Sequence, residues 1–137
     1  MGRTHQDEVH VGQLLTISEL IIELFFMKKK RPKVRLINFD KKITRHLPIL
    51  SGPPKNHCLQ SGLVVLQPKK SCGKHSTENY EELLIVLEGK GKVEIKGQRS
   101  FSIRPNVAVY HPPHTKHNVI NTGTEPLKYI YIVTKVV

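Results

Sequence analysis

From residue 33 onward, the chain is built of short apolar runs of strand character separated by turn residues, and no helical periodicity interrupts them. Tight-turn signals stand at Gly89–Gly91, Lys96–Gln98 and Asn121–Gly123. Short strands at nearly even spacing, without helices between them, predict an all-β sandwich or barrel. The expected strands are Val34–Asn38, Gly62–Gln67, Leu83–Glu88, Lys92–Lys96, Arg99–Ile103, Val107–Tyr110, Asn118–Asn121 and Leu127–Lys135.

One of these runs, Leu83–Leu87, is apolar at every position instead of alternating. A strand of this kind is covered on both faces. One face would line the barrel, and the other needs either the N-terminal segment or a second subunit to cover it. We therefore expect a homodimer.

The N-terminal region has a different texture. Thr16 and Glu19 have the spacing of a capping box, in which each side chain satisfies the other residue's amide. Apolar residues then recur at helical spacing, which predicts one short helix near residues 17–27. Residues 1–12 are polar and are expected to be disordered. We divide the chain into an N-terminal extension, residues 1–32, with a disordered start, a short helix and a basic linker, and a β-barrel domain, residues 33–137.

A second interpretation of the N-terminal region stays open. Met27 is followed by three lysines and would make a reasonable true start, leaving a domain of about 110 residues. The preceding residues would then be an upstream extension.

The chain carries a formal net charge of +11, from 22 basic and 11 acidic residues. Such a surplus favours anionic partners, including phosphorylated or carboxylated small molecules. Part of the charge is clustered between Lys28 and Arg35, but no aromatic residue is interleaved there for base stacking and no reading helix follows. We interpret this cluster as a solvated linker and do not expect nucleic-acid binding.

Cys58 and Cys72 are the only cysteines, and they form no CxxC pair. The lysine run follows the first apolar stretch instead of preceding it, so the pattern is not that of a signal peptide, and no stretch is long enough to span a bilayer. These features predict a soluble, cytoplasmic protein with reduced thiols and no membrane association.

Two segments, residues 75–82 and 112–117, carry the residues best suited to chemistry. They place His75, Glu82 and His117 next to strand-like runs. Two imidazoles and a carboxylate are the set that a divalent metal uses when it keeps open positions for a substrate. The same set suits iron(II), manganese, nickel or zinc, and we predict a metal site at these three residues.

The spacing of these segments resembles the two motifs of the cupin superfamily, small RmlC-like barrels that usually hold one metal ion. His75, Glu82 and Gly89 fall on the first motif, and Pro112, His117 and Asn121 fall on the second. The resemblance implies an antiparallel double-stranded β-helix, or jelly-roll barrel. Four positions depart from the pattern: Thr77 replaces the second histidine of the first motif, and the residues at three glycine positions are Lys69, Asn106 and His114. Asn and His tolerate a positive φ better than most residues.

The residues themselves give a coherent geometry for such a site. His75 and Thr77 lie two apart and therefore point to the same face of a strand. A turn through Asn79 and Tyr80 would bring Glu82 inward at the start of the next strand. In place of the missing imidazole, either Thr77 holds a water molecule or His114 swings in, and the sequence does not decide between them.

The resemblance implies several functions. The first is a metal-dependent enzyme acting on a small anionic molecule such as a sugar acid or sugar phosphate, by isomerisation or epimerisation. The second is an iron(II)-dependent dioxygenase, and the third is a non-enzymatic sugar-binding or sensor module; a degenerate cupin without its metal is also left open. No catalytic residue is assigned, although Tyr80, His111 and Tyr129 are weaker candidates for general acids. Cys72 is interpreted as a small buried hydrophobic residue rather than a soft ligand.

Overall fold

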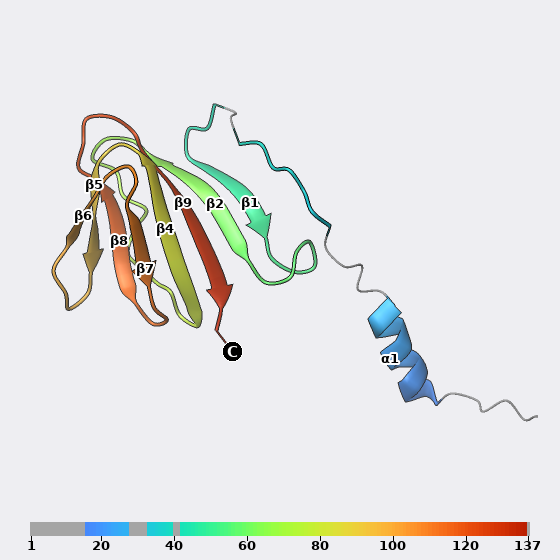
Figure 1. Cartoon of the computed structure of the whole chain (residues 1–137). Helices are drawn as coiled ribbons and strands as arrows, with labels where there is room; N and C mark the ends of the chain where they lie inside the picture. The colour runs from blue at the N-terminus through green and yellow to red at the C-terminus, as the bar shows by residue number, and fades with distance from the viewer. Residues whose placement is uncertain (1–15, 28–32, 40–41, 137) are drawn as a thin grey trace, which may run out of the picture. The chain divides into compact units, whose positions relative to one another are not determined.

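The computed structural model describes residues 16–27, 33–39 and 42–136, and it divides into two compact units, residues 1–33 and 34–137. The described residues of the first unit form the helix α1 (Ile17–Met27), with the predicted limits (Figure 1). Its capping box is present, since the Thr16 amide donates to Glu19 Oε2 at 2.8 Å and the Glu19 amide to Thr16 Oγ1 at 3.3 Å. The predictions for residues 1–12 and for the linker at 28–32 lie outside the described residues.

The second unit is an antiparallel β-structure of two sheets (Figure 1). The larger sheet has the strand order β1-β2-β9-β4-β7, and the smaller has the order β3-β8-β5-β6. The strands are β1 (His46–Ser51), β2 (Gln60–Leu66), β3 (His75–Ser76), β4 (Tyr80–Glu88), β5 (Gly91–Ile95), β6 (Phe101–Ile103), β7 (Ala108–His111), β8 (Lys116–Asn121) and β9 (Leu127–Lys135). Among the described strands, no ladder joins the two sheets, so the barrel is not closed by hydrogen bonds.

The all-β, antiparallel prediction is confirmed, with three local differences, at Val34–Asn38, at β1 and at the two-residue strand β3, which was not among the expected strands. Residues Val34–Asn38 are extended but are not part of any strand, so the strand predicted there is wrong. Strand β1 was not predicted, and it contains Pro48, a residue that is uncommon inside a strand. Proline is tolerated there because β1 lies at the edge of its sheet, and the pairing with β2 shifts register between Pro48 and Leu50.

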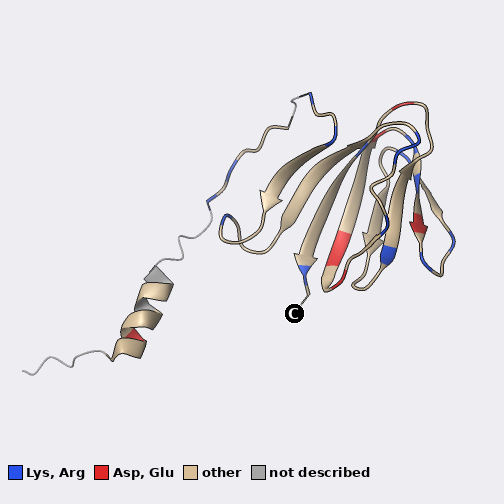
Figure 2. Ribbon diagram, turned by 180° about the vertical axis from the view of Figure 1, so that it is seen from behind, with Lys and Arg blue, Asp and Glu red and all other residues tan. Residues whose placement is uncertain are grey.

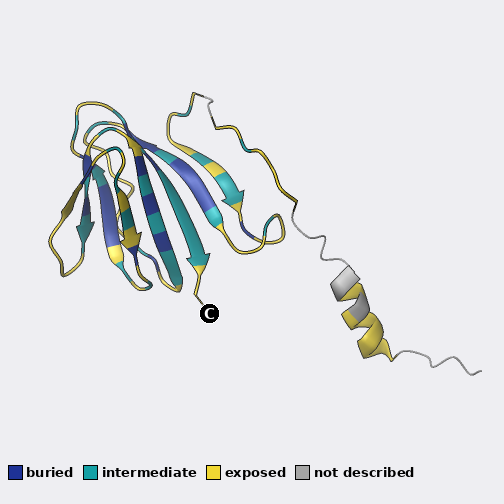
Figure 3. Cartoon of the chain, viewed as in Figure 1, coloured by how far each residue is buried: buried dark blue, intermediate teal, exposed yellow. Residues whose placement is uncertain are grey.

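The core lies between the two sheets. Inward positions of β2, β4 and β8 are buried, as the dark blue stretches in Figure 3 show. In β4, the buried residues Leu84 and Val86 alternate with half-buried ones. The apolar cluster draws on both sheets and comprises Leu66, Leu84, Val86, Val93, Ile103, Val119, Leu127 and Tyr129. Burial of these side chains is the main stabilising contribution to the fold.

The other face of β4 carries the remaining residues of the apolar run. Leu83 and Ile85 are half-buried and Leu87 is 36% exposed. The register pairs Leu83 with Ile132 and Ile85 with Ile130, so the outer face of the larger sheet is apolar as well. The homodimer prediction depends on this apolar outer face, which a second subunit would cover. The homodimer stays a prediction.

Three positions where the cupin pattern has glycine keep the backbone conformation that glycine favours. The φ angles are 65° at Lys69, 66° at Asn106 and 59° at His114. A side chain in this left-handed region costs about 1–2 kcal/mol, with Asn and His better tolerated than Lys. The turns of the motif are therefore preserved although their glycines are not.

Within the described part of the chain, α1 is the only helix, and it is neither long nor apolar enough to cross a membrane. Both cysteines are free.

Candidate metal centre

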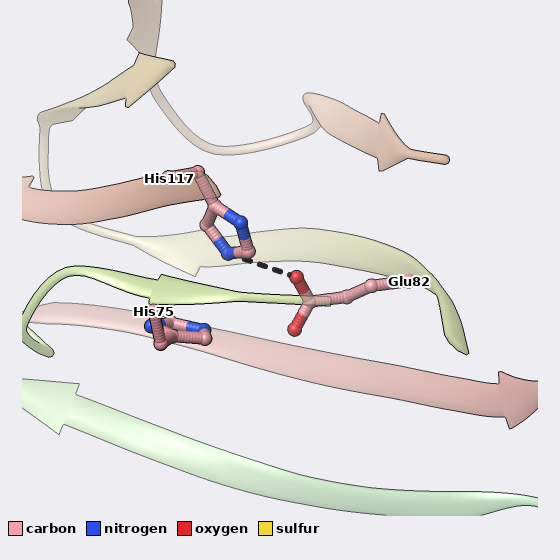
Figure 4. A group of neighbouring side chains, drawn as sticks. All are labelled: His75, Glu82 and His117. Carbon is pink, nitrogen blue, oxygen red and sulfur yellow. Dashed lines mark ion pairs between the residues drawn. The ribbon is translucent and has the colours of Figure 1, made fainter. Parts of the chain in front are cut away.

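The three predicted metal ligands come together at one end of the sheets, which we call the site end. His75 pairs with His117 across the β3–β8 ladder, so the two side chains share a face. Glu82, near the start of β4, reaches the same place from the larger sheet (Figure 4). The turn predicted through Asn79 and Tyr80 lies one residue earlier, at Glu78 and Asn79, and the Tyr80 amide donates to Thr77 O at 2.9 Å. One potential ligand atom from each of the three residues lies within 4.8 Å of the others.

Both imidazoles are oriented through their Nδ1 atoms. His75 Nδ1 lies 2.9 Å from Gly73 O, and His117 Nδ1 lies 3.2 Å from Thr115 O. A carbonyl oxygen can only accept, so each Nδ1 carries the proton and donates it. Nε2 is then the ring nitrogen left to bind an ion, as in sites where a backbone carbonyl fixes a metal-binding histidine, and on His117 this atom lies 3.0 Å from Glu82 Oε2.

Glu82 is the electrostatic centre of the site. Its Oε2 atom lies 3.0 Å from His117 Nε2 and 3.1 Å from His111 Nδ1 (the former is dashed in Figure 4). Burial alone would raise the pKa of Glu82, but the contacts with His111 and His117 outweigh it and lower this pKa to about 2. Burial likewise opposes the charged form of His117, but the Glu82 carboxylate raises the pKa of His117 above its ordinary value.

The polar atoms of this cluster are left without hydrogen bonds. Glu82 Oε2 and both ring nitrogens of His111 are buried with no hydrogen-bond partner. Their short separations satisfy an ion-pair distance, yet the N–H directions do not line up with the oxygen. Buried polar atoms without partners are uncommon and costly in folded proteins. Two ligands of one ion lie about 3–4 Å apart at metal–ligand bonds of about 2.1 Å, so the cluster fits a divalent metal after small side-chain movements.

Thr77, at the position of the missing imidazole, has a structural role. Its Oγ1 donates to Pro112 O at 2.8 Å and accepts the Thr115 amide at 2.9 Å. The hydroxyl thus fastens the end of β3 to the turn that leads into β8. His114 lies on that turn with its side chain exposed, and its amide donates to Glu78 O at 2.8 Å. It is not part of the cluster.

A cavity of about 240 Å³ opens beside the three ligands. Two tyrosines of β9 line it, Tyr129 and Tyr131, and burial raises the pKa of both. Tyr131 was not singled out from the sequence, although it lies two residues from Tyr129 and so shares its face. Its hydroxyl lies 3.1 Å from His46 Nε2. Gly62 makes room for the side chains of His46 and Tyr131, because a Cβ at this position would lie 2.7 Å from His46 Nε2 and 2.8 Å from the Tyr131 hydroxyl.

Cys72 also lines the cavity, and the prediction that it is buried is wrong. Its Sγ accepts the Val119 amide at 3.3 Å and lies 3.6 Å from Asn118 Oδ1. Tyr80 is half-buried at the start of β4 and is not among the residues that line the cavity.

A larger groove of about 680 Å³ shares His75 and His117 with the cavity. Three lysines line it, Lys74, Lys96 and Lys116, together with Glu78 and Glu94. Basic residues are spread over both sheets and their turns, whereas acidic residues are few (blue and red in Figure 2).

Sequence comparison finds two kinds of relative. An uncharacterised protein of Methanocaldococcus jannaschii is 32% identical over 72 residues, which is 53% of this chain and 55% of that protein. A glucose-6-phosphate isomerase of Pyrococcus abyssi is 34% identical over 62 residues, which is 42% of this chain and 33% of the isomerase. The chain thus matches about half of the first relative and a third of the second.

Solved structures share the fold. A Cupin 2 conserved barrel domain protein from Salinispora arenicola superposes with a TM-score of 0.64 at 19% identity, covering 76% of this chain and 91% of that one. An RmlC-like cupin family protein from Methanocaldococcus jannaschii, with a double-stranded β-helix fold, superposes with a TM-score of 0.62 at 17% identity, covering 74% and 91%. The cupin domain family matches residues 62–133, more than half of the chain, and the chain belongs to the cupin family.

Proposed function

We propose that the protein binds a divalent metal ion through His75, Glu82 and His117 and acts on a small anionic molecule, as an isomerase or epimerase of a sugar phosphate or sugar acid. One observation carries the metal: two imidazoles, each with Nδ1 against a backbone carbonyl, converge on a buried carboxylate whose Oε2 has no hydrogen-bond partner. When bound, such an ion supplies Lewis-acid chemistry that polarises a carbonyl or hydroxyl oxygen.

The size of the cavity limits the substrate. Ligand pockets for drug-sized molecules have volumes of about 300–1,000 Å³. The cavity of about 240 Å³ lies just below this range, so it suits a molecule of the size of a monosaccharide.

The charge around the site favours an anion. Lys74, Lys96 and Lys116 line the groove that shares His75 and His117 with the cavity. A phosphate or carboxylate group held by these ammonium groups would place the rest of a small molecule near the imidazoles. The net charge of +11 acts in the same direction at longer range.

The cavity offers hydroxyl groups to a polyol. The raised pKa values of Tyr129 and Tyr131 keep both phenols protonated at neutral pH, so each can donate a hydrogen bond. Apolar side chains, among them Val64 and Val133, form much of the rest of the wall and would pack against the carbon skeleton of the bound molecule. The partial similarity to glucose-6-phosphate isomerase makes an aldose–ketose interconversion the first reaction to test.

The test begins with metal content. Protein purified without a histidine tag is analysed for bound elements beside a His117→Ala variant. Near-stoichiometric metal in the wild type only would support the site. Interconversion of glucose 6-phosphate and fructose 6-phosphate, followed by NMR with and without added metal, then tests the reaction. Turnover that needs the metal and is abolished by Glu82→Ala would support the enzyme. A folded wild type that takes up no iron, manganese, nickel or zinc would refute the metal site.

A second function has its own support. Two histidines and one carboxylate form the facial arrangement of non-haem iron(II) oxygenases. Iron-dependent oxygen consumption in the presence of a small anionic substrate would select this function over isomerisation. Sugar binding that persists in a His75→Ala, His117→Ala double variant would instead select a binding module that does not use the metal.

A further inference from the structure

His111, the last residue of β7, is the most buried polar residue at the site end. Its side chain has no exposed surface. The β4–β7 ladder pairs His111 directly with Glu82, which brings its Nδ1 to 3.1 Å from Glu82 Oε2. The His111 imidazole therefore contacts the Glu82 carboxylate, which we propose as a metal ligand.

The position of His111 relative to His117 excludes a shared ion. The two rings are stacked, with centroids 3.9 Å apart and an interplanar angle of 10°. A metal bound to an imidazole nitrogen lies in the plane of the ring, and two stacked, nearly parallel planes have no common point near their nitrogens. His75 differs, because its ring meets that of His117 at 61°, with centroids 4.4 Å apart. His75 and His117 can therefore converge on one ion, whereas His111 and His117 in this arrangement cannot.

We infer that His111 is a positioning residue of the metal site: it orients the Glu82 carboxylate through Nδ1 and the His117 ring through stacking, and it is not itself a ligand. This inference rests on the proposed metal site. Ligating carboxylates need a hydrogen-bond partner outside the coordination sphere, and such partners matter nearly as much as the ligands.

The presence of a histidine at position 111, where a phenylalanine would fit, supports a role for His111 in the metal site. A phenylalanine would fill the same space and stack on His117 without placing two nitrogens in the interior. Both nitrogens of His111 lack hydrogen-bond partners in the metal-free protein, which costs stability. A nitrogen beside Glu82 also serves a second purpose once the carboxylate has to be held in one orientation to bind an ion. The need is greater here than in a site with a fourth protein ligand, because the Thr77 hydroxyl is fully used by Pro112 and Thr115.

Two variants of the full chain separate the two functions of the ring. His111→Phe keeps an aromatic ring against His117 but removes the nitrogen that lies 3.1 Å from Glu82 Oε2. His111→Asn removes the ring but places an amide nitrogen close to the position of Nδ1. His57→Gln, which changes an exposed imidazole away from the cavity, is the matched control. The probe is cobalt(II) alone, with its Kd measured by competition with a chromophoric chelator and its coordinated imidazoles counted by X-ray absorption.

We expect His111→Phe to weaken cobalt(II) binding by about 10- to 100-fold. His111→Asn should recover part of this loss, and His57→Gln should bind like the wild type. The imidazole count should be two in the wild type and in both His111 variants. Far-UV circular dichroism and urea unfolding of metal-free His111→Phe should show a folded protein under the binding conditions, so weaker binding would not reflect unfolding.

Three imidazoles on cobalt in the wild type, falling to two in His111→Phe, would overturn the inference by making His111 a ligand. Wild-type affinity in folded His111→Phe would overturn it as well, while leaving the proposed metal site intact. Folded wild-type protein that binds no cobalt(II) would refute the metal site itself, and the inference with it.

Discussion

The buried carboxylate of Glu82 makes the stability of the metal-free protein depend on pH. The pKa of Glu82 is lowered from 4.5 to about 2 in the folded protein. Because the folded-state pKa lies below the unfolded value, ionised Glu82 stabilises the fold in full above about pH 5, and this contribution is lost as the pH falls toward the folded pKa. The substitution Glu82→Gln removes the charge with little change in shape.

The pKa difference sets the size of the effect. At about 1.4 kcal/mol per pKa unit, the lowering of the Glu82 pKa from 4.5 to about 2 corresponds to about 3 kcal/mol. Since the unfolded chain binds the proton first, about 2 kcal/mol of this is already lost between about pH 6 and pH 3. The stability advantage of the wild type over Glu82→Gln should therefore shrink by about 2 kcal/mol across that range.

The assay is urea unfolding of metal-free protein in the presence of a chelator, at several pH values. The chain has no Trp, so far-UV circular dichroism is the appropriate signal. Glu81→Gln is the matched control, because it removes the same charge from the next residue of β4, whose side chain contacts the Tyr110 hydroxyl. Its effect should vary far less with pH. A wild-type advantage over Glu82→Gln that stays constant from pH 6 to pH 3 would refute the reasoning.

Three further predictions follow from the same geometry. Thr77→Val removes both hydrogen bonds of the hydroxyl and should lower the free energy of unfolding by about 1–3 kcal/mol in urea titrations. The metal stoichiometry should stay unchanged. Loss of the metal would make Thr77 part of the site. Lys69→Gly should raise the free energy of unfolding by about 0.5–1 kcal/mol. Glycine adopts the left-handed φ of 65° without the steric strain of a lysine side chain, and this gain exceeds the entropy that glycine loses on folding. A lower melting temperature would contradict this prediction. A proton must leave His117 Nε2 before the ion binds, so metal affinity should rise with pH until the pH exceeds the raised pKa of His117. At pH values below this pKa, the affinity should fall roughly tenfold for each pH unit. A Kd independent of pH between 5 and 8 would show that His117 is not a ligand.

Strand prediction succeeded where local chemistry decides the structure. The runs that became β2, β4, β5, β8 and β9 combine apolar or alternating residues with turn residues at their ends. The failures have a common cause in tertiary context. Val34–Asn38 has the composition of a strand, but the described structure gives it no partner strand. Strand β1 contains Pro48, and only its place at the sheet edge makes that residue acceptable.

The candidate site could be predicted only in part from spacing. The spacing singled out His75, Glu82 and His117, and the structure brings these three residues together. The partner of Glu82 across the β4–β7 ladder could not be foreseen, because the register between strands far apart in sequence depends on the whole sheet. His111 therefore stood out only as a weak candidate for a general acid. Likewise, the role of Thr77 depends on the approach of the turn at Pro112 and Thr115, which no local pattern specifies.

The inward-facing side chains of β4 become polar toward the site end, and this change explains how a small domain tolerates such a site. In β4 they run from Val86 and Leu84 to Glu82. In β8 they run from Asn121, whose amide nitrogen donates to Leu66 O and Glu125 O, through Val119 to His117. The apolar end supplies the packed core, so the site end can leave Glu82 Oε2 and the His111 nitrogens without hydrogen bonds. Replacing buried ion pairs by apolar residues of similar volume is often neutral or stabilising. Extending the apolar pattern through Glu82 and His117 would therefore be compatible with the fold, and the polar cluster is better explained by what it binds than by what it stabilises.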